Sequence, residues 1–244
     1  MAPAVILFMH TIVLARWAAA ALVTILAVAA PPYPTMRPVG EYLMARDAEI
    51  ALARTAAPTA ISEHATIVVL TRRGYETAVQ GTNGFVCFVE RGWIGPFDHP
   101  EMWNPKIRGP DCLNPQAARS VLPLIEKKTA LYLAGRSKAE VIAAVKAALA
   151  HGELPRQLEP GAMSYMMSRS AYLHDAGDHN GSHLMFYAPI VHSEDWGTGI
   201  EHSPVVAAVS YWFMSTNTES LNFPPIMVFA VPLATWSDGS PADH

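Results

Sequence analysis

The amino-acid sequence predicts an α+β fold in a single domain. Short runs of β-branched and aromatic residues occupy residues 65–89, two helical segments follow over residues 114–151, and strand-like runs return in the last third of the chain. Strands therefore stand before and after a central pair of helices. Because strands and helices do not alternate one by one, the pattern favours antiparallel strands over a parallel β-α-β arrangement.

The first 30 residues follow the order of a secretory signal peptide. Arg16 precedes an apolar stretch that ends with the small residues Ala27 and Ala29, and a proline-rich segment starts at Pro31. Signal peptidases need small side chains before the cleaved bond, so we expect cleavage after Ala29 or Ala30. Residues 31–244 then form one exported α+β domain, periplasmic or secreted.

Two alternatives stay open at this end of the chain. Residues 4–15 are already apolar, and a true start at Met9 instead of Met1 would give a more ordinary signal peptide. An uncleaved anchor over residues 4–30 is long enough to span a bilayer, although Arg16 near its middle would cost about 2.5 kcal/mol or more. Contact with a membrane would then run only through this segment.

Charge and composition exclude one class of partner. The chain has 17 Lys and Arg against 21 Asp and Glu, and residues 1–30 contain only Arg16, so residues 31–244 carry a net charge of −5. They contain no block of Lys or Arg. A mildly acidic domain of this kind lacks the electrostatic footprint of a nucleic-acid-binding protein.

Two cysteines, Cys87 and Cys112, predict one structural disulfide, because an even pair in an oxidising compartment is normally bonded. A redox-active pair is usually close in sequence, and these two are far apart. The bond closes a loop rich in glycine and proline. The chain-entropy model assigns about 3.5 kcal/mol to such a loop.

The elements can be placed in order along the chain. Spacing of apolar residues predicts one amphipathic helix over residues 39–53, stopped before Pro58. Runs at 65–71, 75–80 and 85–89, separated by glycine-containing turns, predict a three-stranded antiparallel meander. The disulfide would tie its last strand to the start of the next helix.

Capping residues mark the central helices. Asn114 and Pro115 are a preferred N-cap and first-turn residue, Pro123 kinks or restarts the helix, and it stops at Gly135. A capping box from Ser137 to Glu140 opens the second helix, which Gly152 ends. Three further strands are expected at residues 184–190, 205–214 and 226–231.

Histidines and carboxylates gather over residues 174–183. His174, Asp175, Asp178, His179 and His183 fall within ten residues, and imidazole with carboxylate suits a divalent metal such as zinc. The candidate ligands are His179 and His183 with Asp178 or Asp175. The spacing matches no named metal motif, and a solvated loop with local turn hydrogen bonds explains the same residues.

Two further candidates accompany this cluster. His183 stands at the entry to an apolar run, where it could act as a general base or as a hydrogen-bonded residue of a sheet edge. Asp98 and His99 lie in the disulfide-closed loop, whose aromatic residues could form one wall of a pocket. Motifs of serine hydrolases and phosphate-binding glycine loops are absent from the sequence.

Three segments of the last third carry a resemblance: Gly161–Leu173, His183–Pro189 and Val231–Gly239. Together they resemble a group of exported bacterial proteins of unassigned function. The resemblance implies a bacterial envelope setting and supplies no active-site residues.

Two functions fit these observations. The first is an exported soluble protein that acts without catalysis, as a binding or envelope-associated protein; it needs no cofactor, and its partner is open. The second is a secreted metal-dependent hydrolase that uses the cluster at residues 174–183, with a metal-bound water as nucleophile.

Overall fold

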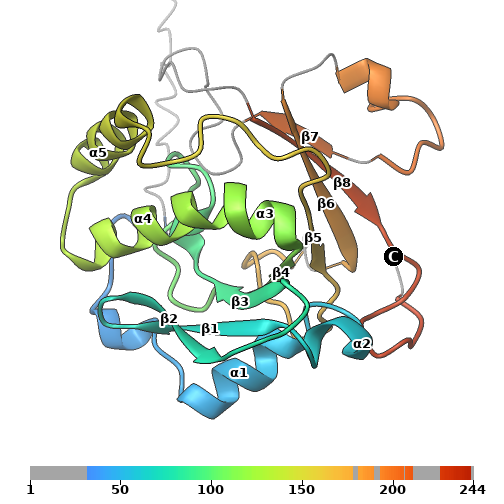
Figure 1. Cartoon of the computed structure of the whole chain (residues 1–244), viewed down its shortest axis with the longest axis horizontal. Coiled ribbons are helices and arrows are strands. Elements are labelled where there is room, and N and C mark those ends of the chain that lie inside the picture. The colour runs from blue at the N-terminus through green and yellow to red at the C-terminus, as the bar shows by residue number, and fades with distance from the viewer. Residues whose placement is uncertain (1–31, 178–180, 190–192, 206, 211–225, 243–244) are drawn as a thin grey trace, which may run out of the picture. The chain divides into compact units, whose positions relative to one another are not determined.

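A mixed β-sheet organises the protein, in which the strands run in the order β2-β1-β3-β4-β5-β6-β8-β7 (Figure 1). The computed structural model describes residues 32–177, 181–189, 193–205, 207–210 and 226–242. Within these residues the sheet has eight strands. Their bounds are β1 Thr66–Thr71, β2 Gly74–Val79, β3 Val86–Glu90, β4 Gly109–Leu113, β5 Met163–Met166, β6 His183–Pro189, β7 Ala207–Ser210 and β8 Ile226–Pro232.

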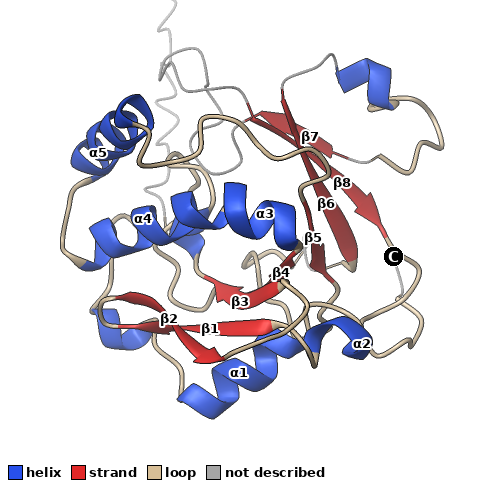
Figure 2. Ribbon diagram, viewed as in Figure 1, coloured by secondary structure: helices blue, strands red, loops and turns tan. Residues whose placement is uncertain are grey.

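Along the chain, helices come before the first strand and again between β4 and β5 (Figure 2). The α-helices are α1 Arg46–Arg54, α2 Thr59–Ser62, α3 Pro115–Ser120, α4 Leu122–Leu133 and α5 Lys138–His151. Short 3-10 turns lie at Val39–Glu41, Gly92–Ile94 and Ser193–Trp196. Helices α3, α4 and α5 separate β4 from β5, which confirms the predicted α+β fold with a central helical region. None of the described helices combines the length and apolar character that a membrane crossing requires.

Alternation along β1, β3 and β4 divides the core between the two faces of the sheet. On one face, Leu70, Phe88 and Leu113 pack with side chains of α3, α4 and α5. On the other face, Val69 and Val89 pack with alanines of α1 and the chain after it. Strands β1, β3 and β4 are therefore covered on both faces, by α1 and by the central helices.

The predicted antiparallel meander is wrong at its third strand. β1 and β2 form an antiparallel hairpin, but β3 pairs with β1 in parallel, through Thr66 with Val86 and Ile67 with Cys87. The connection from β2 crosses over the start of β1, where the Gly81 nitrogen donates a hydrogen bond to Thr66 Oγ1. A Cβ at Gly81 would lie 2.2 Å from the Thr66 nitrogen, so glycine permits this close crossing.

The predicted disulfide is present, but its second partner is not at a helix start. Cys112 lies in β4, a strand that the sequence analysis did not predict, and pairs directly with Cys87 of β3. Both cysteines are fully buried on the α1 face. The bond therefore joins two neighbouring strands and closes the loop of residues 88–111.

The capping predictions for the central helices are confirmed. Asn114 accepts a hydrogen bond from the Ala117 nitrogen and Pro115 begins α3, while α4 restarts at Leu122 beside Pro123. Ser137 and Glu140 form the capping box of α5, and Gly152 ends it in the left-handed conformation.

Outside the central helices the predictions are less complete. The helix expected over residues 39–53 is a 3-10 turn followed by α1, and the short strand β5 was not predicted. The C-terminal strands occur as β6, β7 and β8. The part of the expected strand 205–214 beyond Ser210 lies outside the described residues.

Candidate functional site

The residues predicted as zinc ligands are only partly described. Asp178 and His179 lie outside the described residues, whereas His183 begins β6 and is 8% exposed. Its Nδ1 lies 2.7 Å from the Gly181 carbonyl oxygen. Within the part of the chain that the structure describes, no three His, Cys, Asp or Glu side chains are arranged to hold a metal ion. The zinc site at residues 178–183 stays a prediction.

His174, the first residue of the histidine cluster, packs against the disulfide-closed loop. The ring centroids of His174 and His99 lie 6.0 Å apart, and the Arg108 and Tyr172 backbones pair beside them. His174 Nε2 lies 3.2 Å from the buried carboxylate of Glu101, and His174 Nδ1 accepts a hydrogen bond from the Ala176 nitrogen. Both ring nitrogens of His174 therefore have partners, which fits a structural role.

Asp175 binds the neighbouring segments together. Its carboxylate accepts hydrogen bonds from the Tyr33 and Tyr172 hydroxyls, the Lys106 ammonium and the Asn104 amide, at 2.5 to 2.9 Å. These donors, the Tyr172 hydroxyl first, hold the pKa of Asp175 well below its usual range. A carboxylate with four donors is a poor metal ligand, so Asp175 does not fit the alternative role proposed for it.

A second polar group lies inside the sheet between β3 and β4. Glu90 and Asp111 point to the face covered by α4, and both are buried. As two carboxylates, Glu90 Oε1 and both Asp111 oxygens would have no donor among the described residues. Burial raises the pKa of both groups, that of Asp111 to about 7, and their proximity favours one proton shared within the pair.

Lys128 of α4 lies near this acid pair. Its ammonium donates hydrogen bonds to the Ile94 and Gly95 carbonyl oxygens, at 3.2 and 2.6 Å, and lies 4.3 Å from the centre of the Phe97 ring. Burial holds the pKa of Lys128 well below its usual range. The group is closed from solvent and therefore offers no surface for a substrate.

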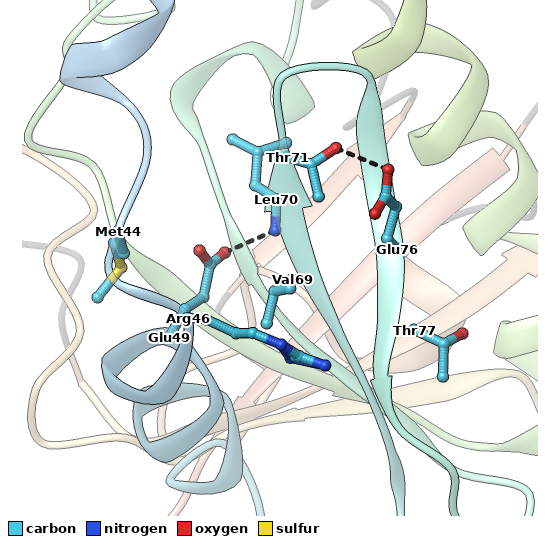
Figure 3. Close-up of a pocket in the computed structure, with 8 residues that line it drawn as sticks. All are labelled: Met44, Arg46, Glu49, Val69, Leu70, Thr71, Glu76 and Thr77. Atoms are coloured by element: carbon cyan, nitrogen blue, oxygen red, sulfur yellow. Dashed lines mark hydrogen bonds between the residues drawn. The ribbon is translucent and has the colours of Figure 1, made fainter.

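An open pocket lies on the opposite side of the sheet, between α1 and the β1–β2 hairpin (Figure 3). Its cavity volume is about 200 Å³. Both elements contribute charged side chains, Arg46 and Glu49 from α1 and Glu76 from β2, and Val69 adds an apolar surface. The full lining is Met44, Arg46, Glu49, Val69, Leu70, Thr71, Glu76 and Thr77.

Glu49 forms the inner wall of this pocket. β1 and β3 pair only at their first residues, so the Leu70 nitrogen is not used by β3 and donates instead to Glu49 Oε1, at 3.1 Å. The same oxygen lies 2.9 Å from Arg91 Nη2, in an ion pair whose side chains are 1% and 0% exposed. Glu49 Oε2 is buried and has no hydrogen-bond partner among the described residues.

The rim of the pocket holds two exposed charges of opposite sign. Arg46 extends from α1 toward β2, where its Nη2 donates to the Ala78 carbonyl oxygen at 2.9 Å (Figure 3). Glu76 Oε1 accepts hydrogen bonds from Thr71 Oγ1 and Arg73 Nη2, each at 3.1 Å. These contacts hold both side chains in place at the mouth.

Sequence reasoning did not single out Glu49, Glu90 or Asp111. One signal was present for Glu49, because it stands four residues before Ala53 and so shares the buried face of the helix. Glu90 follows Phe88 by two residues in a strand, which places both on the same face. Their partners come from other elements, and no local pattern identifies those.

Comparison with known proteins found no match to a family model, to a curated protein or to a solved structure.

Proposed function

We propose that this chain is an exported binding protein that acts without catalysis and holds a small polar ligand in the pocket between α1 and the β1–β2 hairpin. The observation that carries the proposal is the convergence of Arg46, Glu49 and Glu76 on one small pocket. Ligand sites are typically concave, with an apolar surface and a few well-placed polar groups.

Export is supported by two independent features. The first 30 residues have the order of a signal peptide, and the two cysteines of the chain form a buried disulfide. Disulfides persist in oxidising compartments and are rare in the cytosol. These two features support our proposal that the domain works in the bacterial envelope or outside the cell.

The polar groups of the described residues support binding over catalysis. Both ring nitrogens of His174 have partners, and the Glu90–Asp111 pair is buried away from solvent. At the mouth of the pocket, Arg46 and Glu76 are exposed and are held in place by hydrogen bonds. Preformed polar groups of this kind recognise a ligand with little reorganisation.

Expression of the full chain in a bacterial host tests both parts of the proposal. N-terminal sequencing of the exported protein should begin at Ala30 or Pro31. Amide NMR spectra of that protein, recorded with a set of small polar molecules, should show shifts at Met44, Leu70 and Thr71. Cytosolic retention of the intact chain would refute export, and shifts confined to other regions would refute the pocket.

The metal-dependent hydrolase is kept as a second candidate because of one contact. His183 Nδ1 faces the Gly181 carbonyl, and a histidine held in this way commonly presents Nε2 to a metal. This hypothesis predicts one equivalent of zinc by elemental mass spectrometry of untagged protein, lost in the double variant His179→Ala/His183→Ala. Metal-free protein after incubation with zinc would refute it.

A further inference from the structure

We infer that the loop of residues 193–205 docks a basic, partly apolar segment of a partner protein, with a cationic side chain stacked on the exposed face of Trp196. This surface is separate from the pocket of the proposed function. Among the described residues, the large apolar side chains that stand exposed are Trp196 and Ile200, at 43% and 62%. Both belong to the 193–205 loop, and exposed apolar side chains that gather in one place mark interaction surfaces.

Trp196 is held rigidly by the sheet beneath it. It ends the 3-10 turn Ser193–Trp196 and stacks on Phe229 of β8, with ring centroids 4.1 Å apart and 9° between the ring planes. Phe229 is fully buried. Because this parallel stack covers one face of the indole, the opposite face is the one presented to solvent. An aromatic side chain fixed in this way loses little conformational freedom when a partner binds.

Two tight turns after Trp196 position Ile200 in the same loop. The Ile200 nitrogen donates to the Gly197 carbonyl oxygen at 3.2 Å, and the Ser203 nitrogen donates to the Ile200 carbonyl oxygen at 3.0 Å. Ile200 Cδ1 lies 4.0 Å from the position that a Cβ of Gly197 would occupy. Figure 1 shows this loop, in orange, at the outside of the molecule beyond β7 and β8. A partner can therefore reach both apolar side chains.

The charge of this part of the chain selects a cationic partner. No Lys or Arg follows Arg169 in the sequence, whereas residues 170–244 contain eight Asp and Glu. In the loop itself the side chains of Asp195 and Glu201 are exposed. An open indole face with carboxylates nearby attracts a cation, both through the ring and through the complementary charge.

An arginine next to an aliphatic residue fits these features best. A guanidinium can stack flat on the indole while its N–H groups reach a carboxylate such as Asp195 or Glu201. The aliphatic neighbour would cover Ile200. A small amine would use the indole face and leave Ile200 exposed, and an anionic membrane would be repelled by the same two carboxylates.

The test titrates a short peptide of Arg, Leu and Ser, with both ends blocked, into the isotope-labelled exported protein. Matched peptides carry Gln or Glu in place of every Arg. Binding is followed by NMR at the Trp196 indole Nε1–H and at the Gly197 and Gly199 amides. We expect the arginine peptide to bind at least about tenfold more tightly than the glutamine peptide, and the glutamate peptide to leave these signals unchanged.

Variants separate the aromatic face from simple hydrophobic cover. Trp196→Leu keeps an apolar side chain over Phe229 but removes the ring, so it should weaken binding of the arginine peptide about tenfold. Trp196→Phe should retain most of the binding, because it restores an aromatic face. Glu201→Gln should weaken binding about twofold to threefold. Glu63→Gln, at an exposed carboxylate outside the loop, is the matched control and should leave binding unchanged.

Circular dichroism verifies that each variant folds. If Trp196→Leu does not fold, the comparison of the three peptides and Glu201→Gln still decide the question. Equal binding of the arginine and glutamine peptides, or full affinity in a folded Trp196→Leu variant, would overturn the cationic partner. Shifts confined to residues outside 193–205, or no shift with any of the peptides, would overturn the docking surface itself.

Discussion

Cys87 and Cys112 occupy directly paired positions on the neighbouring antiparallel strands β3 and β4, and their disulfide lies on the face of the sheet that packs against α1. The loop that the bond closes supplies Arg91 as the ion-pair partner of Glu49 and Glu101 as the partner of His174. One covalent bond thus supports both the pocket and the histidine region.

Loss of this disulfide should destabilise the protein strongly. Its cysteines are 25 residues apart, and chain entropy assigns such a loop about 3.5 kcal/mol. We expect Cys87→Ala/Cys112→Ala to lower the free energy of unfolding by about this amount, measured by urea denaturation at fixed pH. Wild-type protein kept in reductant should match the variant, and an unchanged denaturation midpoint in both would contradict the prediction.

Gly81 should tolerate no side chain. A Cβ there would lie 2.2 Å from the Thr66 nitrogen, where the chain crosses the start of β1. We expect Gly81→Ala to cost about 3 kcal/mol, the upper range for overpacking a rigid site. Gly40→Ala is the matched control, since nothing lies within 4 Å of its Cβ position. Equal denaturation midpoints for the two variants would show that the crossing is flexible.

The parts of the fold that local chemistry specifies could be predicted from the sequence. Asn114, the Ser137–Glu140 capping box and Gly152 act within one helical turn, and all three predictions are confirmed. The choice of which strand pairs with which could not be predicted in this way. The turn signals around Gly81 give no information on which side of β1 the next strand lies, and that choice depends on close backbone packing.

The candidate site was less accessible to sequence reasoning for the same reason. In the sequence, Glu49 looks like an ordinary solvated charge on an amphipathic helix. Its buried partner Arg91 lies 42 residues later, so no local pattern indicates the contact. The histidine cluster was visible as a local density of residues. Its first member, however, is engaged by Glu101 from a distant loop, which the spacing could not reveal.

Glu49 and Arg91 should depend strongly on each other. Their ion pair is buried, so removing one partner leaves a buried charge without compensation, at a cost of about 3 to 5 kcal/mol. We expect Arg91→Met to lower the free energy of unfolding by this amount. The double variant Glu49→Leu/Arg91→Met should recover part of the loss, because no charge then remains buried. Additive effects of Glu49→Leu and Arg91→Met in a double-mutant cycle would contradict this coupling.

The buried acid pair should make stability depend on pH in a direction opposite to ordinary paired carboxylates. Burial raises the pKa of Asp111 to about 7, whereas an unfolded aspartate titrates near 3.9. The folded state therefore holds its proton more tightly, so the contribution of Asp111 is intact below about pH 4 and is lost as the pH rises through about 7. Lys128, whose pKa is lowered, contributes a slope of opposite sign.

The variant Asp111→Asn isolates this contribution, because an amide has the shape of the protonated acid and does not titrate. Between pH 4 and pH 8, the free energy of unfolding of the wild type should fall relative to the variant by more than about 1.4 kcal/mol, the value of one pKa unit. Urea denaturation at each pH measures both. Asp47→Asn, at an exposed carboxylate of α1, is the matched control. A parallel pH dependence in wild type and Asp111→Asn would mean that folding does not raise the pKa of Asp111, and the prediction would be wrong.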